Sequence, residues 1–254
     1  MREGSGLVRF EQEPNNDHKH AQKINVPCEL VGQFYAERDF DWFEFEAKKG
    51  QTYWIELISN QLGLASDPFL AIYRVSKSDK GEQLSEVAQV DDAAERGRRN
   101  PNTDDLDVTS DDPTYKFVAP EDAAYRLFIR DQFGDSRRDP SFVYRLVIRT
   151  AEPDFRLLAY PAAPPASQQQ QTQTVVSPAS IRRGGTAAFS LVVQRRDEFD
   201  GEIAVSVEGL PAGITCPGAV LGGSVSEGSL VLIAADDAAA WSGPIKIIGD
   251  RKST

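Results

Sequence analysis

The chain has 254 residues, of which 40% are hydrophobic and 26% are charged, a length and composition typical of two soluble globular domains. Lysine and arginine together number 28 and aspartate and glutamate 39, which gives a formal net charge of −11. This balance argues against binding to nucleic acid and against simple electrostatic binding to anionic lipid, because both need a basic protein surface.

The sequence contains no run of about 18 apolar residues, so we expect no membrane span. No apolar segment follows Met1–Gly6, so we expect no secretory signal and interpret the chain as a mature or excised fragment. Cys28 and Cys216 fall in different predicted domains. A disulfide between them is one possibility, and two isolated thiols make no zinc motif.

Oxygen-bearing side chains dominate two segments near the N-terminus. The first segment surrounds Pro14 and has the composition of a loop, and the second precedes a predicted strand that starts near Trp42. If the fold brings them together, they form an all-oxygen cluster that suits a calcium ion, which takes about 6–8 oxygen ligands. The candidate ligands are Glu11, Glu13, Asn15, Asn16, Asp39 and Asp41. The alternative is that these are solvated turn residues.

Apolar residues alternate with polar ones along most of the next hundred residues, which predicts β-strands. In the segment after Asp41, Phe43, Phe45 and Ala47 share one face, and Trp42 lies on the other. Trp54 likewise lies opposite Tyr53, Ile55 and Leu57. Trp42 and Trp54 are therefore either an exposed surface for ligands or residues buried under loops. The strands are expected in 30–34, 42–47, 52–58, 69–75, 84–90, 115–117, 125–129 and 142–148, with Phe69, Ala71, Tyr73 and Val75 on one face.

The most acidic stretch runs from Asp91 to Asp112 and includes interleaved arginines. One interpretation is a long solvated loop. The other is that Asp91 and Asp92 form a second acidic site, which holds a cation or orders the loop by pairing with those arginines.

Residues 151–172 are rich in proline, alanine and glutamine, which predicts a semi-rigid linker between a first domain over 10–150 and a second over 173–254. The second domain is also expected to be β, with strand candidates around Val175, 187–193, 203–207, 230–232 and 245–247. Because the sequence ends soon after the last of these, we expect a final strand to lie outside it. Short alternating strands with no long amphipathic helix predict all-β sandwiches.

We find no sequence motif for catalysis. His18 and His20 could ligate zinc as a His-x-His pair, but their polar surroundings favour two solvated histidines. The sequence has no nucleophile elbow, phosphate loop or zincin helix. Asp39 and Asp41 could in principle run glycoside hydrolysis, although their position beside an acidic loop fits cation binding better. We therefore expect a chain that is not an enzyme.

Several segments in combination resemble the bacterial pre-peptidase C-terminal (PPC) domain. They are 13–17, 31–33, 39–45, 49–51, 67–73, 91–92, 124–127 and 144–146, and the likeness spans roughly residues 10–150. The resemblance implies a jelly-roll β-sandwich related to the collagen-binding domains of clostridial collagenases. It aligns Glu11, Glu13, Asn15 and Asn16 with a calcium-binding linker, and Asp39 and Asp41 with later acidic ligands. Asn16 stands where that family often has aspartate.

In the second domain, Gly209–Ile214 resembles a turn of bacterial immunoglobulin-like domains. Together the two resemblances imply a non-catalytic, extracytoplasmic pair of modules (periplasmic, secreted or at the cell surface) that is stabilised by Ca²⁺. Its partners would be an extracellular protein or polysaccharide and other domains of the same polypeptide. The alternative is an accessory region of a secreted peptidase or other hydrolase. A third hypothesis is a carbohydrate-active enzyme that uses the acidic residues.

Overall fold

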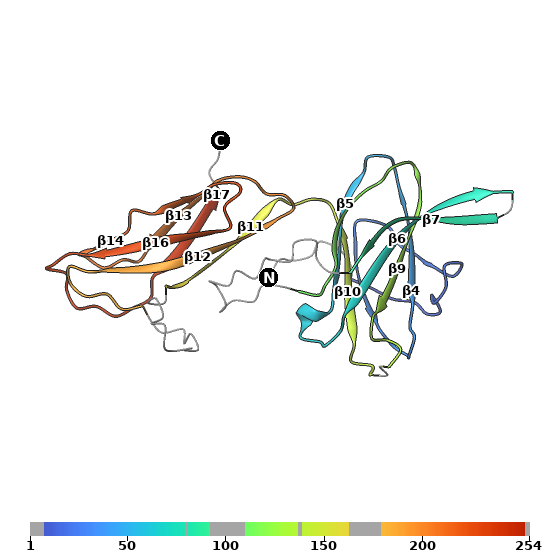
Figure 1. Ribbon diagram of the computed structural model, residues 1–254, viewed down its shortest axis with the longest axis horizontal. Coiled ribbons are helices and arrows are strands. Elements are labelled where there is room, and N and C mark those ends of the chain that lie inside the picture. The colour runs from blue at the N-terminus through green and yellow to red at the C-terminus, as the bar shows by residue number, and fades with distance from the viewer. Residues whose placement is uncertain (1–7, 80, 92–109, 137–138, 163–178, 252–254) are drawn as a thin grey trace, which may run out of the picture. The chain divides into compact units, whose positions relative to one another are not determined.

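The computed structural model describes residues 8–79, 81–91, 110–136, 139–162 and 179–251. The chain divides into two compact units, Met1–Ala151 and Glu152–Thr254, and each is a β-structure (Figure 1). The described residues contain one 3₁₀ turn, η1 (Asn60–Leu62), and no α-helix. The all-β fold expected from the alternation is therefore confirmed.

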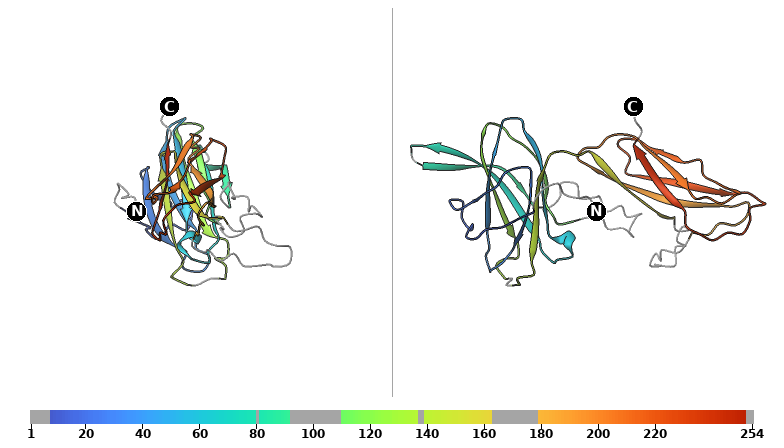
Figure 2. Two further views of the ribbon diagram at one scale, coloured as in Figure 1. Left: turned by 90° about the vertical axis from the view of Figure 1, so that its left-hand side faces the viewer. Right: turned by 180° about the vertical axis from the view of Figure 1, so that it is seen from behind.

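The first unit is a sandwich of two five-stranded sheets. Its first sheet has the order β1-β3-β10-β5-β8 and the second the order β2-β4-β9-β6-β7. The β6–β7 hairpin extends beyond the rest of its sheet (Figures 1 and 2). The strands are β1 (Arg9–Phe10), β2 (Gln22–Lys23), β3 (Cys28–Gln33), β4 (Asp41–Ala47), β5 (Thr52–Ile58), β6 (Pro68–Ser78), β7 (Gly81–Val90), β8 (Thr114–Val118), β9 (Ala123–Asp131) and β10 (Val143–Arg149).

The core of the first unit lies between the two sheets and follows the predicted alternation. Phe43, Phe45 and Ala47 of β4 are buried, and Trp42 on the opposite face is only half-buried. Burying each large apolar side chain contributes about 1.5–3 kcal/mol relative to leaving it exposed, so this face stabilises the sandwich. The largest fully buried side chains are Tyr125, Tyr144, Phe43, Phe45, Phe117, Leu30, Ile55, Leu57, Leu70, Ile72, Leu127 and Ile129.

Strand β6 places its predicted face on the outside of the sandwich. Leu70 and Ile72 are its core residues, whereas Phe69 and Tyr73 are half-buried on the outer face. Phe69, Ala71 and Tyr73 share the outer face, because β6 pairs with β9 without a register shift from Pro68 to Arg74. The register shift opposite Ile72 and Tyr73 lies in β7, where Val87 is the extra residue of a β-bulge.

The second unit has a four-stranded sheet, β11-β12-β16-β14, and a three-stranded sheet, β15-β13-β17. Its buried core includes Leu191, Val193, Ile203, Val205 and Leu230. The strands are β11 (Asp154–Pro161), β12 (Thr186–Arg196), β13 (Ile203–Glu208), β14 (Ile214–Thr215), β15 (Ala219–Leu221), β16 (Glu227–Ala234) and β17 (Lys246–Arg251).

The linker predicted over 151–172 is corrected in its first part, because residues 154–161 form strand β11 and pair with β12. Within this range Phe155, Leu157 and Leu158 are expected to begin the second domain or to dock on it, and β11 belongs to the second unit. Residues 163–178, which include the strand expected around Val175, lie outside the described residues.

Candidate metal site

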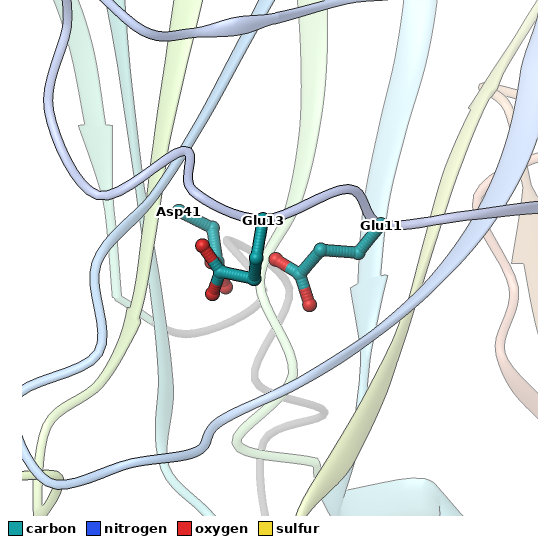
Figure 3. A group of neighbouring side chains, drawn as sticks. All are labelled: Glu11, Glu13 and Asp41. Atoms are coloured by element: carbon teal, nitrogen blue, oxygen red, sulfur yellow. The ribbon is translucent and has the colours of Figure 1, made fainter.

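The two oxygen-rich segments lie together at one end of the first sandwich. One ligand atom each of Glu11, Glu13 and Asp41 lies within 4.8 Å of the other two. Figure 3 shows these carboxylates turned toward one another, with Glu11 and Glu13 on the same loop and Asp41 at the start of β4. We call Glu11, Glu13, Asn15, Asp39 and Asp41 the oxygen cluster.

The alternation of β4 explains why the two aspartates enter the sandwich. Asp39 and Asp41 have the same parity as Phe43 and Phe45, so their side chains extend the core face past its last apolar residue. Asp41 is completely buried and Asp39 is 5% exposed. The strand thus places two carboxylates where the hydrophobic face ends.

Backbone pairing holds the N-terminal loop against these strands. The Glu11 amide donates to the Val31 carbonyl (2.9 Å), and the Trp42 amide donates to the Asn15 carbonyl (3.0 Å). The Asn15 amide also donates to Glu13 Oε2 at 2.9 Å. These bonds fix both ends of the segment that carries the loop carboxylates.

Glu11 is the best-satisfied carboxylate of the oxygen cluster. Its Oε2 accepts from the Gln33 amide at 2.9 Å, and its Oε1 accepts from Asn15 Nδ2 and from the Tyr144 hydroxyl, both at 3.0 Å. Tyr144 is fully buried on β10 and lies opposite Gly32. A Cβ atom at Gly32 would overlap the Tyr144 ring and hydroxyl, so the glycine leaves the space through which Tyr144 reaches Glu11.

The oxygen cluster contains buried acceptors without donors. Asn15 Oδ1, Asp39 Oδ1 and both Oδ atoms of Asp41 are buried and accept no hydrogen bond. Buried polar groups are normally paired, and an unpaired one costs about 1–3 kcal/mol. The four oxygens can each accept a ligand, and none can donate while the aspartates are ionised.

The carboxylates also repel one another. Burial, together with the nearby carboxylates of Glu13 and Glu11, raises the pKa of Asp39 to about 7. Burial, with Glu11 close by, raises the pKa of Asp41 well above its usual range. Burial and the neighbouring Asp41 and Glu11 carboxylates raise the pKa of the Tyr144 phenol, so it stays protonated and can donate. The arrangement therefore favours either bound protons or a bound cation.

Two predicted site residues lie apart from the oxygen cluster. Asn16 is exposed, and no hydrogen bond among the described residues joins it to the oxygen cluster. Asp91 is exposed and accepts from the Gln132 side chain, whereas Asp92 lies outside the described residues. Sequence reasoning missed Tyr144 and Gly32, which are 112 positions apart and which only the β3–β10 register brings together.

The two tryptophans do not form one surface. Trp42 lies on β4 in the second sheet and Trp54 on β5 in the first. The Trp42 ring instead packs against Phe128 (5.0 Å between centroids) and Tyr73 (5.5 Å). Phe69 and Phe40 extend this group through Phe128, and all five rings are half-buried. We call Phe40, Trp42, Phe69, Tyr73 and Phe128 the aromatic face.

Neither histidine joins a metal-ligating group of the described residues. His20 Nδ1 lies 2.7 Å from Asp17 Oδ2, and His18 packs edge-on against Trp42. Both cysteines are free, and they lie in different units. No helix among the described residues is long and apolar enough to cross a membrane.

No protein-family model and no curated protein matches this chain. Among solved structures, it is similar to the pre-peptidase C-terminal domain of collagenase from Bacillus anthracis, with 12% identity, 51% of this chain and 94% of that chain covered, and a TM-score of 0.33. It is also similar to CorA, a surface-associated copper-binding protein important in Methylomicrobium album BG8 copper acquisition, with 10% identity, coverage of 57% and 98%, and a TM-score of 0.33. At these values we base no functional conclusion on either likeness.

Proposed function

We propose that this chain is a non-catalytic, extracytoplasmic binding module of a larger exported protein, and that Ca²⁺ stabilises its first domain. The observation that carries the proposal is the set of four buried, unpaired oxygens on Asn15, Asp39 and Asp41 beside the carboxylates of Glu11 and Glu13. A cation bound among them would supply the partner that each of these acceptors lacks.

The donor set favours a hard cation. All of the ligand atoms are carboxylate or amide oxygens, which suit calcium, whereas thiolates and imidazoles would favour zinc or copper. Glu11, Glu13, Asp39 and Asp41 would hold the ion through carboxylate oxygens and Asn15 through Oδ1. When bound, the ion would neutralise their mutual repulsion and tie the N-terminal loop to β4.

Burial argues against glycoside hydrolysis by the same aspartates. A hydrolase needs both carboxylates to reach a sugar ring, with a gap that admits substrate or water. Asp41 is completely buried and Asp39 nearly so, which leaves a polymer no access to them. A structural ion fits this position, and a substrate does not.

The aromatic face is the part of the first domain that we propose binds a polymer, either an extracellular protein or a polysaccharide. Its five rings are half-buried, and they gather on the outer side of one sheet, four of them on β4, β6 and β9 and Phe40 directly before β4. Aromatic rings offer large contact area at little cost in conformational entropy. Arg130, whose guanidinium lies 5.1 Å from the Phe69 ring centroid, and His18 supply polar groups at its rim.

Thermal melts test the metal. A ligand at a hundredfold excess over its Kd adds about 2.7 kcal/mol, which raises the Tm of a domain of this size by roughly 5–10 °C. We expect this shift between calcium and chelator in the wild type and in Glu46→Gln, which alters an exposed carboxylate at the other end of β4. Identical melting curves in both conditions would contradict a calcium site.

Tryptophan fluorescence tests the aromatic face. Binding of a soluble polysaccharide or extracellular protein should quench the emission of wild-type protein, and Trp42→Phe should remove that change. Trp54→Phe, the matched control on the other sheet, should preserve it. A panel of such polymers that leaves the wild-type emission unchanged would remove the support for this surface and would leave the calcium proposal intact.

A further inference from the structure

Strand β9 places two arginines on the aromatic face, one on each side of Phe128. Arg126, Phe128 and Arg130 have the same parity, so their side chains leave the same side of the sheet. In the register of β9 with β6, Arg126 lies opposite Tyr73, and Arg130 lies opposite Phe69. Each guanidinium therefore has an aromatic residue of the face as its neighbour on the next strand.

The two arginines differ in their charge partners. Arg126 is 5% exposed, and its Nε and Nη2 donate to Glu44 Oε2 and Glu82 Oε2 at 2.7 and 2.8 Å. Among the described residues, Arg130 has no carboxylate partner, and its Nε is buried without an acceptor. Its guanidinium lies over the ring of Phe69, 5.1 Å from the centroid. The positive charge of Arg130 is therefore the one that this face leaves for a ligand.

The position of Arg130 suits a carboxylate. A guanidinium is planar and always charged, and its N–H donors form a fork that matches the two oxygens of a carboxylate. Contact with the Phe69 ring limits the orientations of the guanidinium before any ligand arrives. The aromatic face thus combines rings, which bind apolar surface, with a single cationic fork.

The three strands under the aromatic face offer a ligand side chains only. Strand β4 lies between β2 and β9, β9 lies between β4 and β6, and β6 lies between β9 and β7. An extended peptide that binds as an added strand needs an unpaired edge, and none of these three strands is one. A sugar ring needs no backbone partner, because it stacks its apolar C–H face on an aromatic ring and offers oxygens to side chains. The observations therefore favour a polysaccharide over an extended peptide.

We propose, on the basis of the polymer-binding function proposed above, that the polymer is a polysaccharide whose sugars carry carboxylates. Its sugar rings stack on Trp42 and Phe128, and one of its carboxylates accepts hydrogen bonds from Arg130. From Arg126 to Arg130 the face extends four residues along β9, about 13 Å, which is longer than one sugar ring. The site therefore takes a chain of sugars rather than a monosaccharide.

The selectivity for this polymer depends on a local contact. The net charge of −11 repels a polyanion at long range, so overall electrostatics supply no attraction. The hydrogen bonds from Arg130 must then provide the preference for a carboxylate over a neutral group.

The experiment uses the whole chain and short oligomers of three acidic polysaccharides, polygalacturonate, alginate and hyaluronate, each paired with its methyl ester. Short oligomers stay soluble with calcium present, and the ester differs from the acid only in the missing charge. Quenching of Trp42 emission measures binding. We expect at least one acidic oligomer to bind, and to bind at least about tenfold more tightly than its ester.

Arg130→Gln should remove this preference. Its affinity for the acidic oligomer should fall at least about tenfold, to that of the ester, while its affinity for the ester stays within about twofold of wild type. Unchanged ester binding shows that the rings are still in place. Arg145→Gln is the matched control, because it removes the same charge from β10 in the other sheet, and it should keep the preference.

Three results would overturn the proposal: no quenching by any acidic oligomer, equal affinity for acid and ester, or an equal response to polyglutamate. The last result would assign the face to an acidic protein segment. Quenching by neutral polysaccharides or extracellular proteins alone would leave the proposed polymer-binding function standing and would reject only the carboxylate. A wild-type emission that no polymer changes would reject both.

Discussion

Asp112 and Asp41 are both buried aspartates of the first sandwich, but their surroundings are opposite. Asp112 Oδ1 accepts from the amides of Ser59 and Asn60, at 2.8 and 2.7 Å, and its Oδ2 accepts from the Gln61 amide at 2.9 Å. Neither oxygen of Asp41 accepts a hydrogen bond. A buried carboxylate that is surrounded by amide donors holds the fold together, whereas Asp41 lies among other carboxylates, where we propose that a cation binds.

The largest loss of stability is expected when Asp112, the aspartate whose oxygens accept hydrogen bonds, is replaced. Asp112→Ala leaves three amides at η1 without their acceptor, and at about 1–3 kcal/mol for each unsatisfied group we expect a loss of roughly 3–5 kcal/mol of stability. Urea unfolding should show the same loss with calcium and with chelator. A loss that depends on calcium would contradict the purely structural role of Asp112.

The next effect is the pH dependence of the chelated protein. The pKa of Asp39 is raised to about 7 from 3.8 by burial, so the folded state binds a proton more tightly than the unfolded state does. The stabilisation from that proton is complete below pH 4 and is lost as pH rises toward 7, by an amount on the order of a few kcal/mol. Denaturant titrations between pH 4 and 8 measure it, and Asp39→Asn should flatten the curve. With calcium the slope should reverse, because protons then compete with the ion.

Asp41→Asn tests whether calcium binding depends on the charge of the Asp41 side chain rather than on its size. The amide keeps the size of the carboxylate and removes the repulsion, so we expect unchanged or higher stability in chelator. The gain of about 2.7 kcal/mol at a hundredfold excess of calcium over the wild-type Kd should disappear. Thermal melts measure the stability in chelator, and isothermal titration with calcium measures the loss of binding. A strongly destabilised variant in chelator would place Asp41 in the same class as Asp112.

Tyr144→Phe should have the smallest effect. It removes one hydrogen bond to Glu11, worth about 1 kcal/mol, and leaves the ring in place beside Gly32. We expect a slightly lower Tm and an affinity for calcium that is weaker by less than about tenfold, since 1.4 kcal/mol is a factor of ten. Tyr115→Phe is a control on the same sheet, outside the oxygen cluster. An affinity equal to that of wild type would show that Tyr144 does not orient Glu11.

The sequence was most informative where the pattern is local. Alternation predicted β5 at its observed bounds and the core face of β4, because side-chain parity alone decides which residues of a strand are buried. The same parity carries Asp39 and Asp41 into the sandwich. Local pattern could not reveal the bulge in β7, since its extra residue, Val87, is defined only by pairing with β6.

Non-local features escaped prediction for a related reason. That Tyr144 lies opposite Gly32 depends on the register of two strands that are distant in the sequence, and no spacing rule gives that register. The separation of Trp42 and Trp54 depends on which sheet each strand joins. The extent of β11 was missed because the proline-rich residues that directly follow it were grouped with it in one predicted linker, although Phe155, Leu157 and Leu158 were assigned to the second domain.

The Tyr144–Glu11 hydrogen bond joins residues 133 positions apart, and this separation has a consequence for how the oxygen cluster assembles. Contacts between residues so distant in the chain are slow to form, because the chain loses the entropy of closing the intervening loop before the contact contributes any stabilisation. During synthesis, which starts at the N-terminus, the ribosome releases Glu11 and Asp41 well before the residues of β10. The hydrogen bond by which Tyr144 orients Glu11 therefore forms only after β10, the last strand of the sandwich, has paired.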